Sequence, residues 1–231
     1  VFPKIKSSSD FFGESDFEES FSKKIPIIGV VGDAQGSFFA NNCFKIGDTK
    51  ITTGTGFNIQ TNIGDDFSIS DNAFTSLAYT HNSENSYSLE CLSSFAGATI
   101  SWLKNNLQLI KSPDESESIS SNVNNTGGVY LIPAFTGLGP PYWTSSDRAA
   151  FLGINASTNK HHMVRAALES VVFQMIVYIE SIQKDYDFSL QDLVVDGGMI
   201  KNKLFLQLIS SLLNIEIKIP QLEEMSLYGA L

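Results

Sequence analysis

Apolar positions recur with helical spacing through residues 159–185, which predicts a long buried helix that Asn159 caps. The stripe consists of Val164, Leu168, Val171, Met175 and Ile179. Shorter continuous apolar runs lie before and after this segment and are typical of strands buried within a sheet. We expect such strands at 25–32, 129–133, 149–154, 193–195 and 215–219.

Further helices and hairpins fill the intervals between these runs. Rough alternation on both sides of Gly54 and Gly56 predicts a strand pair, and 76–90 predicts a second hairpin that turns at 82–85. Residues 112–128 begin like a helix, although their composition alone favours a linker. Because strands and helices alternate toward the end of the chain, we expect an α/β fold with helices on the faces of the sheet. The other expected helices cover 36–44, 93–109 and 202–213, and one starts at Met225.

Composition narrows the functional classes. The 231 residues are 42% hydrophobic, so they can bury a sizeable core. A net charge of −10 argues against a nucleic-acid surface, but not against an anionic ligand held by backbone amides and a divalent cation. No apolar run approaches the roughly 18 residues of a membrane helix. The chain starts at Val1 and stops within a helical pattern, so we expect it to be a piece of a longer protein.

The two cysteines, Cys43 and Cys91, form neither a disulfide framework nor a CxxC metal motif. Both have apolar neighbours and are interpreted as reduced core residues, which suits a cytoplasmic setting. His81, His161 and His162 lack the spacing of metal ligands, and Trp102 and Trp143 are interpreted as packing residues.

Three expected strands end in glycine or small residues. These ends are Gly32-Asp33, Gly54-Thr55-Gly56 and Asp196-Gly197-Gly198. In open α/β sheets, ligands bind beyond the carboxyl ends of strands. The amides and the Thr55 hydroxyl could hold a phosphate, and the helix starting near Asn202 could add its dipole. The alternative is that these are structural turns, and no GxxxxGK[ST] loop occurs.

Asp33 has two interpretations that position alone does not separate. A carboxylate after a buried strand can take a proton from a hydroxyl or help to hold Mg²⁺. Equally, it can cap the helix that follows. Asp196 is interpreted as a turn former.

Several blocks resemble the C-terminal domain of the FGGY carbohydrate kinases, with glycerol kinases as the most similar members. The clearest block is 129–143, which reads VYLIPAFTGLGPPYW, and 149–169 fits the family signature. The segment 195–202 resembles the family's adenosine loop, 53–56 its phosphate loop, and 95–102 the helix that contacts the nucleotide. The resemblance runs in order from about residue 7 to the end.

The resemblance implies a ribonuclease-H-like, actin-like ATPase domain, with a mixed sheet and helices on both faces. We expect this domain to cover 25–231 and to follow an N-terminal segment, 1–24, of low regular structure. In the family, two such domains close over ATP, Mg²⁺ and a polyol. The partner of this domain would therefore be an N-terminal domain of the same chain that is missing here. Whether the protein also self-associates is left open. Asp33 would be the base and lie near the metal, and Thr55 would meet the transferred phosphate. The implied phosphate and nucleotide residues are Thr53, Gly54, Thr55, Gly56, Gly97, Ile100, Ser101, Gly197, Gly198, Met199 and Asn202.

Departures from glycerol kinases lie where the acceptor would bind. The usual Gln after the catalytic Asp is Ala34, with Gln35 next, and the usual aromatic residue after the phosphate loop is Asn58, beside Phe57. The usual Gln before the helix tryptophan is Ser101. From the resemblance we expect an ATP-dependent kinase that phosphorylates glycerol. The departures favour one alternative, a family member acting on another sugar or polyol. The other alternative is a non-catalytic nucleotide-binding relative. We also expect residues 1–231 alone to be inactive.

Overall fold

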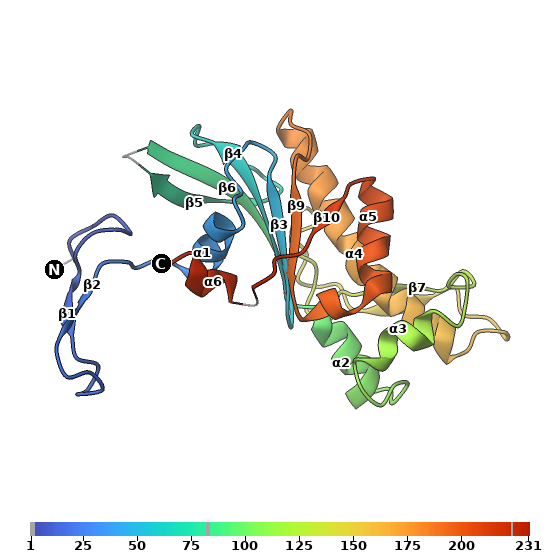
Figure 1. The fold of residues 1–231 in the computed structure, drawn as a ribbon. Coiled ribbons are helices and arrows are strands. Elements are labelled where there is room, and N and C mark those ends of the chain that lie inside the picture. Colours follow the sequence, from blue (N-terminus) through green and yellow to red (C-terminus); the bar gives the residue numbers. More distant parts are fainter. Residues whose placement is uncertain (1–2, 82–83, 223) are drawn as a thin grey trace.

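A central mixed sheet organises the computed structural model, which describes residues 3–81, 84–222 and 224–231 (Figure 1). Its strands follow the order β10-β9-β3-β4-β6-β5. The first three run parallel to one another, and the pairs β3–β4, β4–β6 and β6–β5 are antiparallel. The bounds are β3 Thr49–Thr53, β4 Phe57–Gly64, β5 Phe74–His81, β6 Glu84–Ser93, β9 Leu193–Gly197 and β10 Ile217–Lys218.

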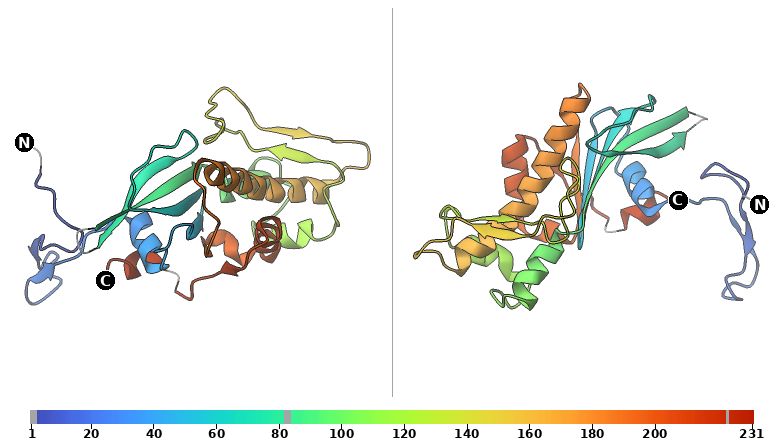
Figure 2. Two further views of the ribbon diagram at one scale, coloured as in Figure 1. Left: turned by 90° about the horizontal axis from the view of Figure 1, so that it is seen from above. Right: turned by 180° about the vertical axis from the view of Figure 1, so that it is seen from behind.

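Helices cover both faces of this sheet, as the sequence predicts (Figures 1 and 2). Helix α1, Asp33–Ala40, and the short α6, Met225–Tyr228, lie on one face, and α4, Lys160–Asp185, and α5, Lys203–Leu213, lie on the other. Helices α1 and α6 touch closely, because a Cβ added at Gly36 would lie 2.8 Å from the Ser226 carbonyl oxygen. Glycine at position 36 therefore permits this contact.

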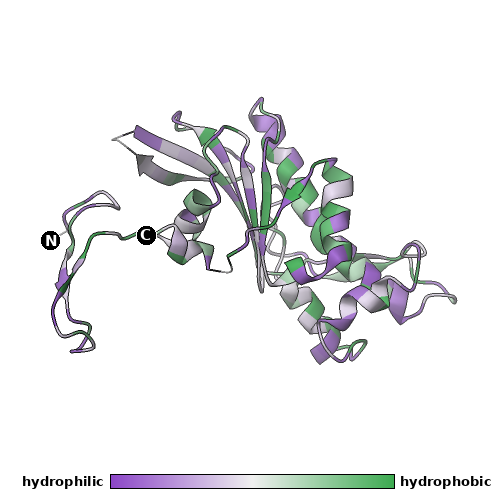
Figure 3. Ribbon diagram, in the orientation of Figure 1, coloured by the Kyte–Doolittle hydropathy of each residue, from purple (hydrophilic) through white to green (hydrophobic). Residues whose placement is uncertain are grey.

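The hydrophobic core lies between the sheet and α4. The Asn159 side chain accepts a hydrogen bond of 2.9 Å from the His161 amide, which confirms the predicted cap. The stripe predicted for this helix is fully buried and packs with the sheet residues Ile51, Ile59, Leu89, Leu193 and Val195. Figure 3 shows apolar residues concentrated along α4 and α5. By length and composition α4 could cross a membrane, but 61% of its most apolar window is buried inside the domain, as in a core helix.

Two short strands make a second sheet beside α4. Strand β7, Tyr130–Ile132, pairs with β8, Ala150–Leu152, in antiparallel register. Leu131 is buried, while Tyr130 and Ile132 are exposed, so the prediction of a fully buried strand at 129–133 is wrong. Only one face of this two-stranded ribbon meets the core, and an apolar run does not reveal how many faces are covered.

The first part of the chain forms a separate ribbon (Figures 1 and 2). Strand β1, Gly13–Ser15, pairs with β2, Ile25–Ile27. The prediction of a buried strand at 25–32 is therefore wrong, since Ile28 is 63% exposed and Val30 is 49% exposed. Burial needs a covering surface, and β2 pairs with a polar strand rather than with a strand of the central sheet.

The remaining helices are shorter than their apolar patterns suggest. Helix α2 is Gly97–Asn105, and α3 is Glu115–Ser120, which resolves the helix-or-linker alternative in favour of a helix. A single turn, η1, Gly198–Lys201, precedes α5. The antiparallel pairing of β5 with β6 confirms the second hairpin, while its turn residues 82 and 83 lie outside the described residues.

Candidate active site

Two of the three glycine-rich strand ends lie side by side because β3 and β9 are parallel neighbours. Thr53 is in register with Gly197, and the Thr53 hydroxyl donates to the Asp196 carbonyl oxygen at 2.8 Å. Gly197 has φ of 90°, and a Cβ there would lie 2.0 Å from the Thr53 carbonyl oxygen. Only glycine fits both the conformation and the contact.

The third predicted site, Gly32-Asp33, is not a strand end, because β2 stops at Ile27, and it reaches the same place through α1. Asp33 begins this helix, and one turn later the Ser37 hydroxyl donates to Asp196 Oδ2 at 3.2 Å. The Asp33 side chain is exposed, and its Oδ1 accepts a hydrogen bond from the Ala34 amide at 2.8 Å. Gly32 is the N-cap of α1 and no side chain caps this helix, so the interpretation of Asp33 as the cap is wrong. Asp33 lies in the first turn and presents its carboxylate to solvent.

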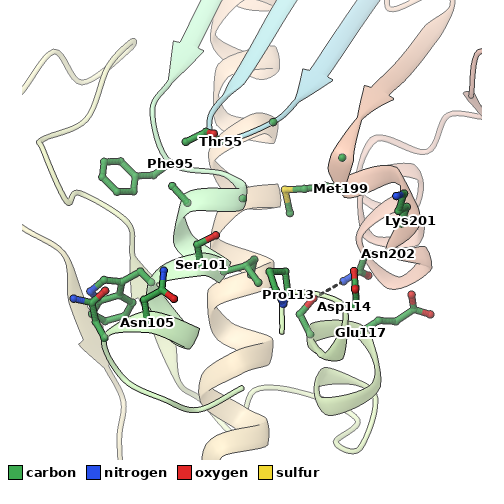
Figure 4. A pocket seen from close by; sticks show the side chains of 18 residues that line it. Thr55, Phe95, Ser101, Asn105, Pro113, Asp114, Glu117, Met199, Lys201 and Asn202 are labelled. Carbon is green, nitrogen blue, oxygen red and sulfur yellow. Dashed lines mark hydrogen bonds between the residues drawn. The ribbon is translucent and has the colours of Figure 1, made fainter. Parts of the chain in front are cut away.

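The loop between β3 and β4 rests on the start of α2. The Gly97 amide donates to the Gly54 carbonyl at 3.0 Å, and the amides of Ala96 and Ala98 both donate to the Thr55 carbonyl at 2.9 Å. A Cβ at Gly97 would lie 2.6 Å from the Gly54 oxygen, which explains this second glycine. The Gly54 amide is bonded to the Gly56 carbonyl at 2.8 Å, so it already has a partner within the loop. The Thr55 side chain lies at the upper edge of the cavity (Figure 4).

A cavity of about 760 Å³ opens below this loop, between α2, α3 and η1 (Figure 4). Its volume suits a nucleotide-sized ligand, since small-molecule sites commonly enclose about 300–1,000 Å³. Phe95 and Trp102 line one side, and both rings pack against Phe135 with centroids 4.6 and 4.9 Å away. Open space lies next to Gly198, where an added Cβ would meet no atom within 4 Å.

Helix α3 fastens the opposite wall to α5. The Asn202 side chain donates to the Ser116 hydroxyl at 3.2 Å and accepts from the Phe205 amide at 2.9 Å (Figure 4). Glu117 accepts from the Lys203 amide at 2.9 Å. The chain's own side chains thus already bond the Lys203 and Phe205 amides at the N-terminus of α5. A contribution of the dipole of this helix to anion binding stays a prediction.

A smaller cavity of about 460 Å³ lies on the other side of the loop. Thr52, Asn58 and Leu92, which are cross-strand neighbours, share its wall, and it meets the larger cavity at Gly54 and Thr55. The loop Gly54–Gly56 therefore borders both cavities.

Phe57 and Gln35, the neighbours of Asn58 and Ala34, are held by other contacts in the structure. Phe57 is 3% exposed and packs in the core, with its ring centroid 5.5 Å from that of Tyr178. Gln35 turns its amide toward Glu90 Oε1 at 3.5 Å. The phenyl ring therefore lies on the opposite face of the sheet from Asn58, because adjacent strand residues point to opposite faces.

The larger cavity brings together most of the residues that sequence comparison selected. Gly54, Thr55, Gly97, Ile100, Ser101, Gly198, Met199 and Asn202 line it. Gly56 and Asn58 line the smaller cavity. Thr53 and Gly197 lie at the adjacent strand ends, outside both cavities, and Asp33 and Ala34 also line neither cavity. The sequence analysis missed the wall from α3, since only tertiary packing brings Pro113, Asp114, Ser116 and Glu117 to the cavity.

Within the described ranges, no cluster of three or more His, Cys, Asp or Glu side chains could hold a metal ion by itself. Mg²⁺ is commonly bound through one or two carboxylates together with substrate phosphates and water, so the exposed Asp33 fits a nucleotide-bound Mg²⁺. His162 Nδ1 accepts from the Asn159 amide as part of the capping box of α4. Cys43 and Cys91 are free and buried, which confirms their interpretation as reduced core residues.

Comparison with known proteins agrees with this geometry. Residues 49–231 match the model of the C-terminal domain of the FGGY family of carbohydrate kinases. The crystal structure of Plasmodium falciparum glycerol kinase with ADP is 36% identical, has a TM-score of 0.91, and is matched over 99% of this chain and 46% of that one.

More distant solved structures share the fold. A ligand-bound xylulose kinase and a gluconate kinase, both from Lactobacillus acidophilus, each have a TM-score of 0.85, at 19% identity over 99% of this chain and 47% of theirs. The fold is thus the actin-like ATPase fold that the resemblance implied, and the chain spans about half the length of these kinases.

Proposed function

Because this chain belongs to the FGGY family of carbohydrate kinases, we propose that residues 25–231 are the nucleotide-binding domain of an ATP-dependent kinase that phosphorylates glycerol. The observation that carries the proposal is the position of the loop Gly54–Gly56, between a nucleotide-sized cavity and a second compartment. Phosphoryl transfer depends mostly on positioning and on charge stabilisation, and this loop separates the donor from the acceptor.

In this proposal each group has a separate task. The larger cavity holds the nucleoside and places the γ-phosphate at Thr55, whose hydroxyl lies at the cavity edge. Asp33 takes the proton from the attacking hydroxyl, which its exposed carboxylate allows. Asp33 would help to hold a nucleotide-bound Mg²⁺, which would neutralise charge on the phosphates. The remaining contacts to ATP and the polyol come from the N-terminal domain that family members carry.

Two other functions remain as alternatives. A family member acting on another sugar or polyol is favoured by Ala34 and Asn58, which leave the acceptor side without the Gln and the aromatic ring of glycerol kinases. A non-catalytic nucleotide-binding relative would keep the cavity but need neither Asp33 nor Thr55. The chain retains both residues, which favours an enzyme. Free buried Cys43 and Cys91 support a cytoplasmic setting.

The decisive experiment measures ATP-dependent phosphorylation by the intact enzyme with glycerol and a panel of sugars and polyols. Asp33→Asn should abolish transfer and leave ATP binding within a few-fold of wild type. Asp147→Asn, at another exposed aspartate, is the matched control. Transfer to a sugar instead of glycerol selects the first alternative, and ATP binding without transfer to any acceptor selects the second.

Residues 1–231 alone should show no turnover. The loop and Asp33 are present, but the other half of the positioning groups is not. Turnover of ATP with glycerol by these residues, lost in Asp33→Asn, would contradict this expectation.

A further inference from the structure

The face of the sheet that carries α1 is polar below the phosphate loop. Lys50 and Thr52 on β3 point to this face, opposite to Ile51, because side chains alternate along a strand. The residues in register with them are Gln60 and Asn58 on β4 and, for Thr52, Asp196 on β9. The proposed function uses Asn58 but assigns nothing to the lysine.

Lys50 is 1% exposed, which is unusual for an ammonium group. Its Nζ donates to Thr52 Oγ1 at 2.7 Å. Among the described residues no carboxylate lies within 4.0 Å of this nitrogen. Burial lowers the pKa of Lys50, while the charges of Asp196, Glu90 and Asp33 act in the opposite direction. A buried cation is costly unless such neighbours compensate it, so its position needs a reason.

Asp196, whose charge acts on Lys50, is hydrogen-bonded to α1 and to the end of β3. Its Oδ2 accepts from Ser37 on α1, the helix that Asp33 begins, and its backbone oxygen accepts from Thr53, next to the loop. Its Oδ1 is buried and has no hydrogen-bond partner in the described part of the chain. Asp196 thus contacts α1 through its carboxylate and β3 through its backbone oxygen, and the charge of this carboxylate acts to raise the pKa of Lys50.

We propose that Lys50 is a positioning residue for phosphoryl transfer, which acts through Asp196 and Thr52 to hold Asp33 and the loop Gly54–Gly56 in their relative places. The inference rests on the proposed function. Asp33 and Asp196 both carry negative charge near the site of the phosphates, and the buried cation offsets it without touching the substrate. Lys50 lies beneath Thr52, so it is not a catalytic residue.

The test is a double-mutant cycle in the intact enzyme, with Lys50→Met, Asp196→Asn and the double variant. Lys50→Met should lower kcat at least tenfold. In the Asp196→Asn background the same substitution should change kcat less than about twofold, because the residue through which the lysine acts is already neutral. The thermal midpoint should be lowest in Lys50→Met, where the half-buried Asp196 loses its neighbouring cation, and should recover in the double variant. Lys184→Met, at an exposed lysine of α4, is the control.

A structural role alone would lower the thermal midpoint of Lys50→Met and leave kcat unchanged, and that result overturns the proposal. Additive losses of kcat in the double variant also overturn it, since they mean that the two residues act independently. Should Lys50→Met fail to fold, the double variant is compared with Asp196→Asn alone: equal kcat supports the proposal and a further tenfold loss rejects it. A wild-type enzyme without transfer to any acceptor would reject the proposed function itself.

Discussion

Thr53 and Asp196 are joined across β3 and β9 by a hydrogen bond of 2.8 Å from the hydroxyl of the first to the carbonyl oxygen of the second. The residues are far apart in sequence, and this bond joins the phosphate loop to the glycine turn that bounds the nucleotide cavity. Thr53 is fully buried, so the bond has little competition from water.

Replacing this hydroxyl with a methyl group should destabilise the protein. Thr53→Val keeps the shape but leaves a buried carbonyl without this donor, which costs about 1–3 kcal/mol of the free energy of unfolding. Chemical denaturation of the intact protein measures the loss, and Thr53→Ser, which keeps the hydroxyl, should recover most of it. Equal stability of wild type and Thr53→Val would mean that the bond contributes nothing.

The nucleotide cavity should close when a side chain is added at Gly198. An added Cβ meets no protein atom within 4 Å, so Gly198→Val should leave the thermal midpoint nearly unchanged. The valine would occupy space that the ligand needs and should weaken ATP binding at least tenfold, or about 1.4 kcal/mol. Calorimetry of the intact enzyme, with Gly198→Ala as a smaller step, checks this. Unchanged affinity would remove the turn from the site.

Acceptor preference should respond to positions 34 and 58. Phe57 is fixed in the core, so it does not supply the missing ring. We expect weak phosphorylation of glycerol by wild type, because one absent hydrogen bond costs on the order of 0.5–1.5 kcal/mol. The double change Ala34→Gln with Asn58→Phe should raise kcat/KM for glycerol by roughly two- to tenfold. An efficient wild type that the double change does not improve would show that these departures do not set acceptor preference.

Stability should fall in alkaline solution because of the two buried thiols. Burial raises the pKa of Cys43 and of Cys91 from 9.0 to about 12. The unfolded chain releases these protons at lower pH than the folded chain, so their contribution is complete below about pH 9 and is lost as pH rises from 9 toward 12. The decline is at most about 1.4 kcal/mol per pH unit for each thiol.

Denaturation curves between pH 8 and 11 test this, and a Cys43→Ala, Cys91→Ala variant should show a shallower decline. At pH 8 the native thiols should resist alkylation, and denaturant should expose both. Rapid alkylation of the native protein would contradict the burial of either thiol.

Local rules of sequence were enough to predict several elements of this fold. The cap at Asn159 and the buried stripe of α4 follow from helical periodicity and capping chemistry, and both are confirmed. The turn at Gly54 and Gly56 between two strands is likewise confirmed, because small residues between alternating segments favour a hairpin. The family resemblance added the fold and most residues of the nucleotide cavity.

Which surfaces are covered, and which polar groups already have partners, depends on tertiary packing. The apolar run 25–32 reads as a buried strand, yet Ile28 and Val30 are exposed, because burial depends on distant segments that come to lie beside a strand. In the fold Gly56 bonds the Gly54 amide and Glu117 bonds an amide at the N-terminus of α5, which the sequence does not reveal. Lys50 carries no local signal of burial, since its position below the loop depends on the register of β3 against β4 and β9.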